Sequence, residues 1–305
     1  MAFDAYHQKL INEHFLPDTL LYNELMSKHT TFKIGGPADL LFLPRKLDEL
    51  VDMIKLCKAE KIPYEIIGKG SNLLVRDKGV RGVVIKLSEF NLHTRVEGTK
   101  IIAGSGVNIT NLSLFAQENG LSGLEFAYGI PGTLGGAVVM NAGAYGGEMQ
   151  DIVKVVWALD EETNLIRIED KDLEFSYRKS IFQRKNWVVV DVEMHMKPDS
   201  KEEIKRRMED YLFRRQDKQP LSYPSAGSTF KRPDGYYAGA LIEQAGLKGK
   251  RIGQAQVSPK HAGFIINLGN ATAEDVLELM ALVQEKVSEK FGVELVPEVK
   301  VIGEK

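Results

Sequence analysis

The chain has 305 residues, of which 43% are hydrophobic and 27% are charged, and its formal net charge is −2. This is about twice the length of a usual single domain, so we expect two domains, or one large domain with an appendage. The near-neutral charge, with both signs spread along the chain, gives no electrostatic case for nucleic acid or an anionic membrane as partner. A small molecule is the expected partner.

The N-terminal sequence MAFDAYHQKLINEHF is polar or charged from its fourth position and lacks the apolar core of a signal peptide. No run of about 18 apolar residues occurs further along the chain, so nothing predicts a membrane-spanning helix. We therefore expect a cytoplasmic protein with no membrane contact, which begins with a helical segment over residues 1–32.

Between residues 39 and 108 the sequence predicts short strands and one amphipathic helix. The strands are DLLFL, YEIIG, NLLV, GVVIKL and KIIAG. In the helix, Leu50, Ile54 and Cys57 recur at helical spacing, so the single cysteine is expected in the core and not as a reactive thiol. One cysteine allows no disulfide, and the histidines lack the HExxH spacing of a zinc site, so no metal is predicted.

A second strand-rich stretch runs from residue 152 to residue 196, where IVKVVWALD and WVVVDVEMHM alternate between apolar and polar positions. A charged helix is predicted to follow over about residues 199–218, with Asp199 or Ser200 as its N-cap. We place a domain boundary near Lys197, between a sheet-rich first part and a smaller α+β second part.

The last hundred residues mix helix and strand. YYAGALIEQAG predicts a helix that ends at Gly246, and GFIINLG predicts a buried strand. Thr272 is expected to cap a long helix with one apolar stripe. The residues of that stripe are Val276, Leu279, Met280, Val283 and Val287.

Two glycine-rich segments indicate a phosphate-bearing ligand. One is GKGSNLL, beginning at Gly68, and the other is GIPGTLGGAVVMNAGAYGGEM, with seven glycines between Gly129 and Gly147. Glycine lets a phosphate approach backbone N–H groups without a Cβ in the way, so two such segments suggest a dinucleotide. Neither completes a GxGxxG or GxxxxGK[ST] pattern. A plain hairpin could explain the first segment, and a tightly packed helix or barrel corner the second.

Three shorter segments carry polar groups among apolar residues or glycine. They are EFSYRKSIF with Arg178, SAGSTFKRP with Ser228, and LVPEVKVIG with Glu298. Taken singly, these residues have ordinary structural explanations: a salt-bridge partner, a turn or cap residue, and a surface carboxylate.

Taken together and in this order, five of these motifs resemble those of the UDP-N-acetylenolpyruvylglucosamine reductases, flavoenzymes of bacterial peptidoglycan synthesis. The motifs are GKGSNLL, GIPGTLGGAVVMNAGAYGGE, SYRKSIF, GSTFKRP and PEVKVIG. The resemblance covers about residues 30–302. At 305 residues the chain is similar to the shorter class of the family, which lacks the insertion that folds a tyrosine over the substrate.

The resemblance implies an α+β fold. A vanillyl-alcohol-oxidase/PCMH-type FAD-binding domain, made of two α+β subdomains, would be followed by a smaller C-terminal α+β substrate domain. The implied parts are an N-terminal helical segment over residues 1–32, the FAD-binding domain over 33–197 and the substrate-binding domain over 198–305.

The implied reaction passes hydride from NADPH to FAD, and then to UDP-N-acetyl-3-O-(1-carboxyvinyl)-glucosamine, giving UDP-N-acetylmuramate. Negative charge develops on the substrate carboxylate and the carbon beside it, as an enolate. Arg178 and Glu298 match the family residues that stabilise this charge, Glu298 as an acid kept protonated by desolvation. Ser228 matches the family's proton donor to the enolate carbon.

The resemblance also implies binding residues for cofactor and substrate. The cofactor-binding residues are Gly68, Lys69, Gly70, Ser71, Asn72, Leu73, Ile130, Gly132, Thr133, Gly136, Asn141, Gly143, Ala144, Arg215 and Lys300. The substrate-binding residues are Tyr177, Lys218 and Arg232. Arg232 stands where many relatives have asparagine, so the details of substrate contact are expected to differ. We expect a monomer whose partners are the UDP-sugar and its cofactors.

Two alternatives stay open at this point. The chain could be another flavin oxidoreductase of the same fold, which would have no reason to keep Arg178, Ser228 and Glu298 together. It could also be a sugar-nucleotide or dinucleotide-binding protein without chemistry, which would be colourless when purified.

Overall fold

The computed structural model describes residues 3–305, and the chain divides into two compact units. Unit 1 is made of the residues up to Leu21, Leu41–Lys69 and Gly82–Arg215. Unit 2 is made of Tyr22–Leu40, Gly70–Arg81 and Gln216–Lys305. Both units are therefore discontinuous in sequence, and the chain passes from one to the other repeatedly.

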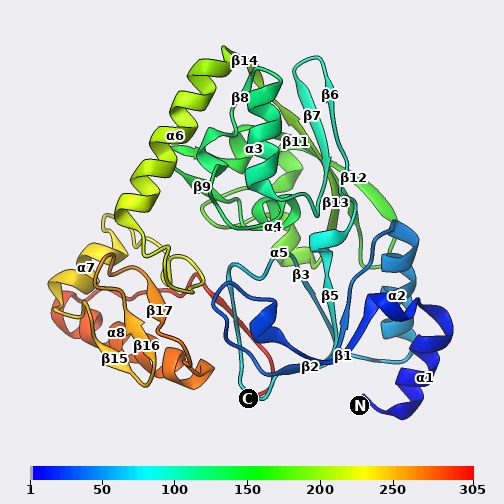
Figure 1. Cartoon of the computed structure of the whole chain (residues 1–305), viewed down its shortest axis with the longest axis horizontal. Coiled ribbons are helices and arrows are strands. Elements are labelled where there is room, and N and C mark those ends of the chain that lie inside the picture. Colours follow the sequence, from blue (N-terminus) through cyan, green and yellow to red (C-terminus); the bar gives the residue numbers. More distant parts are fainter. Residues whose placement is uncertain (1–2) are drawn as a thin grey trace. The chain divides into compact units, whose positions relative to one another are not determined.

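The helices and strands are mixed along the chain, as an α+β fold requires (Figure 1). The α-helices are α1 (Ala5–His14), α2 (Leu47–Ala59), α3 (Ile109–Glu118), α4 (Leu134–Val139), α5 (Ile181–Lys185), α6 (Lys201–Lys218), α7 (Ala238–Gln244) and α8 (Ala273–Phe291). Short 3-10 helices lie at Pro17–Thr19, Met26–Lys28, Leu87–Glu89, Glu125–Ala127, Met149–Asp151 and Asp170–Leu173.

The strands are short except in the middle of the chain. They are β1 (Leu20–Leu25), β2 (Pro37–Phe42), β3 (Tyr64–Ile67), β4 (Leu73–Val75), β5 (Val80–Lys86), β6 (Thr94–Glu97), β7 (Lys100–Gly104), β8 (Leu121–Ser122), β9 (Gly143–Ala144), β10 (Gly147–Glu148), β11 (Val153–Leu159), β12 (Leu165–Glu169), β13 (Val188–His195), β14 (Lys197–Pro198), β15 (Arg251–Ile252), β16 (Ala255–Val257), β17 (Ile265–Asn267) and β18 (Lys300–Ile302).

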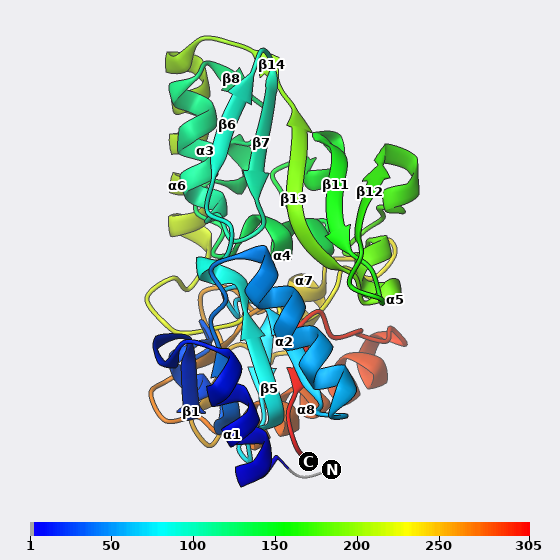
Figure 2. The same ribbon diagram turned by 90° about the vertical axis from the view of Figure 1, so that its right-hand side faces the viewer.

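Unit 1 is built around an antiparallel sheet of five strands in the order β12-β11-β13-β7-β6 (Figure 2). Its apolar residues, such as Val156 and Val192, form one core with buried residues of α3 and α4. The alternation in the sequence thus reflects a sheet with a helix-covered face. The five-stranded sheet carries α4 and the second glycine-rich segment at its centre, because α4 packs on β13 and β7.

Helix α2 buries the apolar face that its sequence predicts. Leu50, Ile54 and Cys57 are almost or wholly inaccessible to solvent, which confirms Cys57 as a core residue. The strand after α2, β3, pairs in parallel with β5.

Unit 2 has its own core. Helices α7 and α8 pack together, and α8 also packs on β15 and β16 of a three-stranded antiparallel sheet (Figure 1). Every residue of the stripe predicted for α8 is buried, and the Thr272 hydroxyl accepts the N–H of Asp275 as an N-cap. Residues from early in the sequence complete this core: Phe32, Ile34 and Leu74.

Most predicted elements are confirmed, and one local detail differs. The N-terminal segment contains α1, but Leu20–Leu25 forms a strand. Of the two N-caps expected for α6, Ser200 is the one that accepts the N–H of Glu203 through its hydroxyl. No helix within residues 3–305 combines the length and the apolar composition that crossing a bilayer would need.

Candidate active site

In unit 1 the start of the first glycine-rich segment, Gly68 and Lys69, lies directly against the second segment. A Cβ placed on Gly68 would be 2.5 Å from the Thr133 hydroxyl oxygen, so any side chain here would push the two segments apart. The plain hairpin considered for the first segment is excluded, because β3 and β4, which flank it, belong to different sheets.

Backbone N–H groups gather where the two segments meet. The N–H groups of Lys69, Gly132 and Thr133 donate to no other group in the described part of unit 1. Such unpaired N–H groups beside glycine suit an anion, because they can donate without a side chain in the way. The residues present therefore fit the diphosphate of FAD.

Other glycines of the second segment serve packing. A Cβ on Gly135 would lie 2.8 Å from the Ser105 Cβ, so α4 approaches the end of β7 more closely than alanine would permit. Three more residues predicted to bind FAD lie in the second segment: Ile130 before α4, Gly136 in α4 and Ala144 in β9. The alternative of a tightly packed corner thus explains part of the glycine content.

Arg178 is tied to the second glycine-rich segment through its guanidinium. The guanidinium donates to the carbonyl oxygens of Asn141, at 3.4 Å, and of Gly143, at 3.1 Å. It also lies 5.0 Å from the ring centroid of Tyr177. Arg178 has a φ of +56°, a left-handed conformation that costs a non-glycine residue on the order of 1 kcal/mol.

Arg215, on α6, packs beside the same segment. Its side chain is almost fully buried, and its guanidinium lies 5.7 Å from the ring of Tyr145, which stacks on Tyr211 at 4.7 Å. Burial lowers the pKa of Arg215 from its usual value. Sequence reasoning missed Tyr145, although its position in the glycine-rich segment was a signal; in the structure it has a φ of +54°.

Unit 2 brings Ser228 and Glu298 onto neighbouring extended segments. The N–H of Glu298 donates to the carbonyl oxygen of Thr229 at 2.8 Å, and Phe230 pairs with Pro297 in an antiparallel bridge. Ser228 is exposed and Glu298 is half-buried. The predicted catalytic residues are thus divided between the units, with Arg178 in unit 1 and the other two in unit 2.

The rest of the first glycine-rich segment lies beside Glu298 in unit 2. Asn72 donates through its side-chain amide to the Glu298 carbonyl oxygen at 3.0 Å and accepts the N–H of Lys300 at 2.9 Å. Leu73 pairs with Lys300 in the parallel ladder of β4 and β18. Gly70 has a φ of +68°, and its carbonyl oxygen accepts the N–H of Thr31.

The remaining predicted residues of unit 2 are Ser71, Lys218 and Arg232. Ser71 follows Gly70 and is half-buried. Lys218 ends α6 and is exposed. Arg232 is exposed and its guanidinium lies 4.5 Å from the ring centroid of Tyr237.

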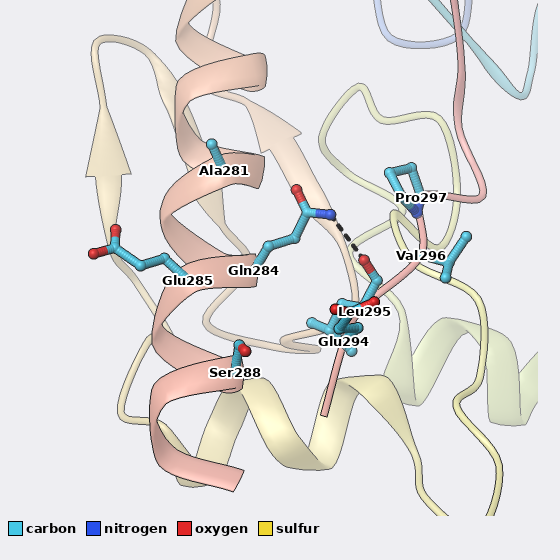
Figure 3. A pocket seen from close by; sticks show the side chains of 8 residues that line it. All are labelled: Ala281, Gln284, Glu285, Ser288, Glu294, Leu295, Val296 and Pro297. Atoms are coloured by element: carbon cyan, nitrogen blue, oxygen red, sulfur yellow. Dashed lines mark hydrogen bonds between the residues drawn. The ribbon is translucent and has the colours of Figure 1, made fainter. Parts of the chain in front are cut away.

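A surface groove lies between α8 and the segment just before Glu298 (Figure 3). Its lining includes Ser288 and Val296, and Gln284 spans it by donating to the Leu295 carbonyl oxygen at 2.8 Å. None of the predicted site residues lines this groove. The Gln284 hydrogen bond attaches the segment before Glu298 to α8, and this groove is not part of the candidate active site. No group of three or more potential metal-ligating side chains occurs in the part of the chain that the structure describes.

Comparison with known proteins shows which family this chain is similar to. A model of an FAD-binding domain matches residues 38–169, and a model of the C-terminal domain of UDP-N-acetylenolpyruvoylglucosamine reductase matches residues 219–302. A UDP-N-acetylenolpyruvoylglucosamine reductase from Caldanaerobacter subterraneus is 57% identical, over 94% of each chain. One from Syntrophomonas wolfei is 51% identical, over 94% of this chain and 96% of that one.

Solved structures of similar fold include one of a UDP-N-acetylenolpyruvylglucosamine reductase. The crystal structure of UDP-N-acetylenolpyruvylglucosamine reductase from Thermus caldophilus superposes with a TM-score of 0.77 at 38% identity, covering 91% of this chain and 97% of that one. Alkyldihydroxyacetonephosphate synthase, at 16% identity and a TM-score of 0.50, shares the fold alone over 64% of this chain and 41% of its own.

The fold and the matched FAD-binding domain define an FAD-binding oxidoreductase, and the expected α+β fold with a PCMH-type FAD-binding domain is confirmed. The chain belongs to the UDP-N-acetylenolpyruvoylglucosamine reductase family.

Proposed function

We propose that this chain is the NADPH-dependent enzyme that reduces UDP-N-acetyl-3-O-(1-carboxyvinyl)-glucosamine to UDP-N-acetylmuramate for peptidoglycan synthesis. Its family supports the substrate and the use of FAD. The observation that carries the proposal is the attachment of Arg178 to the second glycine-rich segment, which ties the expected carboxylate-binding cation to the expected cofactor-binding backbone.

The FAD would be held by the backbone N–H groups of Lys69, Gly132 and Thr133, which are suited to its diphosphate. When bound and reduced by NADPH, it would supply the hydride for the vinyl carbon of the substrate. We assign residues 33–197 to cofactor binding and residues 198–305 to substrate binding, after an N-terminal segment over 1–32. The remaining contacts proposed for FAD lie at the positions given above for both glycine-rich segments, Arg215 and Lys300.

The protein's task is to stabilise the negative charge that develops on the substrate carboxylate. Arg178 would bind that carboxylate with charge-assisted hydrogen bonds, and Glu298, in its protonated form, would donate one more. Arg178 is prepared for this because two backbone carbonyls already fix its guanidinium plane. A group that is held in place before the reaction loses little order during it, which favours catalysis.

Ser228 would deliver the proton to the carbon beside the substrate carboxylate. Its hydroxyl is exposed on the segment that pairs with the Glu298 segment, so acid and proton donor share one rigid backbone pairing. A hydroxyl is a weak acid, but the enolate carbon is a strong base.

Tyr177, Lys218 and Arg232 would contact the substrate, with the two cations suited to its diphosphate. We propose that the enzyme acts as a cytoplasmic monomer.

The test follows the flavin spectrum. The purified protein should be yellow, because oxidised protein-bound flavins absorb at about 450 nm. This absorbance should disappear when NADPH is added without oxygen. It should return when the enolpyruvyl sugar nucleotide is added next. Bleaching without recolouring would indicate a flavin oxidoreductase with another substrate. A colourless protein that takes up no FAD would indicate binding without chemistry.

A further inference from the structure

Arg178 occupies a turn whose backbone does not favour arginine. Ser176 and Lys179 exchange both of their backbone N–H···O bonds, at 3.1 and 3.0 Å, so Tyr177 and Arg178 form a two-residue loop between them. Arg178 has a positive φ at the second loop position, where glycine or asparagine is usual. Such a conformation persists only when its surroundings hold it.

Asn141 holds this turn from the side of the second glycine-rich segment. Its side-chain amide donates to the Ser176 carbonyl oxygen and to Glu148 Oε2, both at 3.1 Å, and its side-chain oxygen accepts the N–H of Gln150 at 3.0 Å. The side chain is fully buried. Because its two amide hydrogens are engaged inside the protein, this side chain serves the Arg178 turn, and the FAD contact proposed at position 141 would not come from it.

Gln183, on α5, holds the turn at a second point. Its side-chain nitrogen donates to the Arg178 carbonyl oxygen at 3.1 Å and to the Val139 carbonyl oxygen at 2.8 Å. The same Val139 oxygen accepts the Ser180 hydroxyl at 2.7 Å. Gln183 therefore joins the backbone of Arg178 to the end of α4, and it does so from an exposed position.

We propose that Asn141 and Gln183 are positioning residues that fix the strained Tyr177–Arg178 turn, and with it the direction of the Arg178 guanidinium. The inference rests on the proposed function for its kinetic consequence, because only then does that direction set the rate of substrate reduction. Its structural consequence, a turn made rigid by two side-chain amides, does not depend on the reaction.

The first test measures hydrogen exchange in the FAD-loaded, full-length protein. Because Asn141 is fully buried, its replacement also threatens folding, so Gln183→Ala is the main variant and Asn141→Asp the second. We expect amide exchange in the peptide covering residues 175–180 to rise at least about tenfold in Gln183→Ala, as local opening becomes easier, and elsewhere to stay unchanged. The matched control is Gln117→Ala, which removes a half-buried glutamine whose side chain donates to the Lys201 carbonyl oxygen. Unchanged exchange at 175–180 in Gln183→Ala would overturn the inference.

The second test separates the half-reactions by anaerobic stopped flow. In Gln183→Ala, flavin reduction by NADPH should stay within about twofold of wild type, while reoxidation by the enolpyruvyl sugar nucleotide slows about tenfold, as a displaced catalytic group predicts. In an Arg178→Ala background, Gln183→Ala should add no further loss. Additive losses, or equal losses in both half-reactions, would contradict a role exerted through Arg178.

A pH profile distinguishes positioning from general damage. In Gln183→Glu a carboxylate faces two carbonyl oxygens at neutral pH, whereas its protonated form can donate again to one of them. The loss relative to wild type should therefore shrink as the pH falls from 8 to 5, and a loss independent of pH would count against the inference. If wild-type enzyme reduced by NADPH is not reoxidised by the substrate, the proposed function fails, and hydrogen exchange still decides the positioning role.

Discussion

Ser228 is the single residue on which the proposed protonation depends. Ser228→Ala should leave flavin reduction by NADPH nearly unchanged, because that step needs no proton on substrate carbon. Reoxidation by the enolpyruvyl sugar nucleotide should fall by about 10²-fold or more, the range of general-acid contributions. Anaerobic stopped flow at 450 nm measures both steps, and Ser222→Ala, an exposed serine of the same unit, is the control. Equal loss in the two steps would refute the assignment.

Cys57 gives a residue-scale prediction about stability. Desolvation raises the pKa of its thiol from 9.0 to about 12, so the thiol stays protonated in the folded state. Above pH 9 the unfolded chain loses this proton while the folded chain keeps it, and stability must fall as the pH rises. Between pH 9 and pH 11, wild type should lose up to about 1.4 kcal/mol per pH unit more than Cys57→Ala does. Urea unfolding at several pH values measures the difference, and parallel slopes would disprove the raised pKa.

Between elements, the contact of Gly68 with Thr133 gives a prediction about cofactor affinity. In Gly68→Ala the added Cβ meets the Thr133 hydroxyl oxygen at 2.5 Å, so the two glycine-rich segments must separate and their N–H groups lose alignment. FAD affinity, measured by quenching of flavin fluorescence, should fall about tenfold or more, the effect of losing one or two charge-assisted hydrogen bonds. Replacing Thr133 by alanine in the Gly68→Ala background removes that oxygen and should recover part of the affinity. No recovery would mean that the clash is not the cause.

The elements also show what the sequence could predict. The cap of α8 by Thr272 was predicted because its partner, Asp275, is three residues away. A second cap was not: Asp77 accepts the N–H groups of Ala273 and Glu274, at 2.8 and 3.1 Å, from a distant part of the chain. Local chemistry leaves a pattern in the sequence, whereas a long-range hydrogen bond leaves none.

The same limit applies to the candidate site. The family resemblance of the motifs pointed to Arg178, Ser228 and Glu298 as a cation, a hydroxyl and an acid for the reaction, and these roles remain predictions. The motifs could not give Gln183, which lies in an ordinary charged helix and acts on the Arg178 backbone. Asn141 was found as part of a motif, but its bonds to Ser176 and Glu148 depend on the fold.

For the molecule as a whole, the main structural fact is that the units interleave in sequence. The functional division of 33–197 and 198–305 is contiguous and remains a prediction about where cofactor and substrate bind. The compact units are not contiguous, because unit 2 takes in Tyr22–Leu40 and Gly70–Arg81. These segments give unit 2 a strand, β4, that pairs in parallel with β18, and the Asp77 cap of α8. Periodicity along the chain cannot reveal such an arrangement, since each short strand looks the same whichever unit it joins.

This interleaving predicts that residues 216–305 do not fold by themselves. Such a fragment lacks Phe32, Ile34 and Leu74, whose burial in the unit 2 core stabilises it by roughly 5–9 kcal/mol at about 1.5–3 kcal/mol per large side chain. That is comparable to the whole net stability of a typical domain, about 5–15 kcal/mol. The fragment also leaves β18 without its partner and two N–H groups at the start of α8 without their acceptor. Circular dichroism should therefore show little helix for α8 and no cooperative melt, and amide proton shifts should cluster near random-coil values, while the full-length chain in the same buffer melts sharply. A sharp melt of the fragment would show that the C-terminal segment alone contains a sufficient core, and that the early segments dock on it without being needed for its folding.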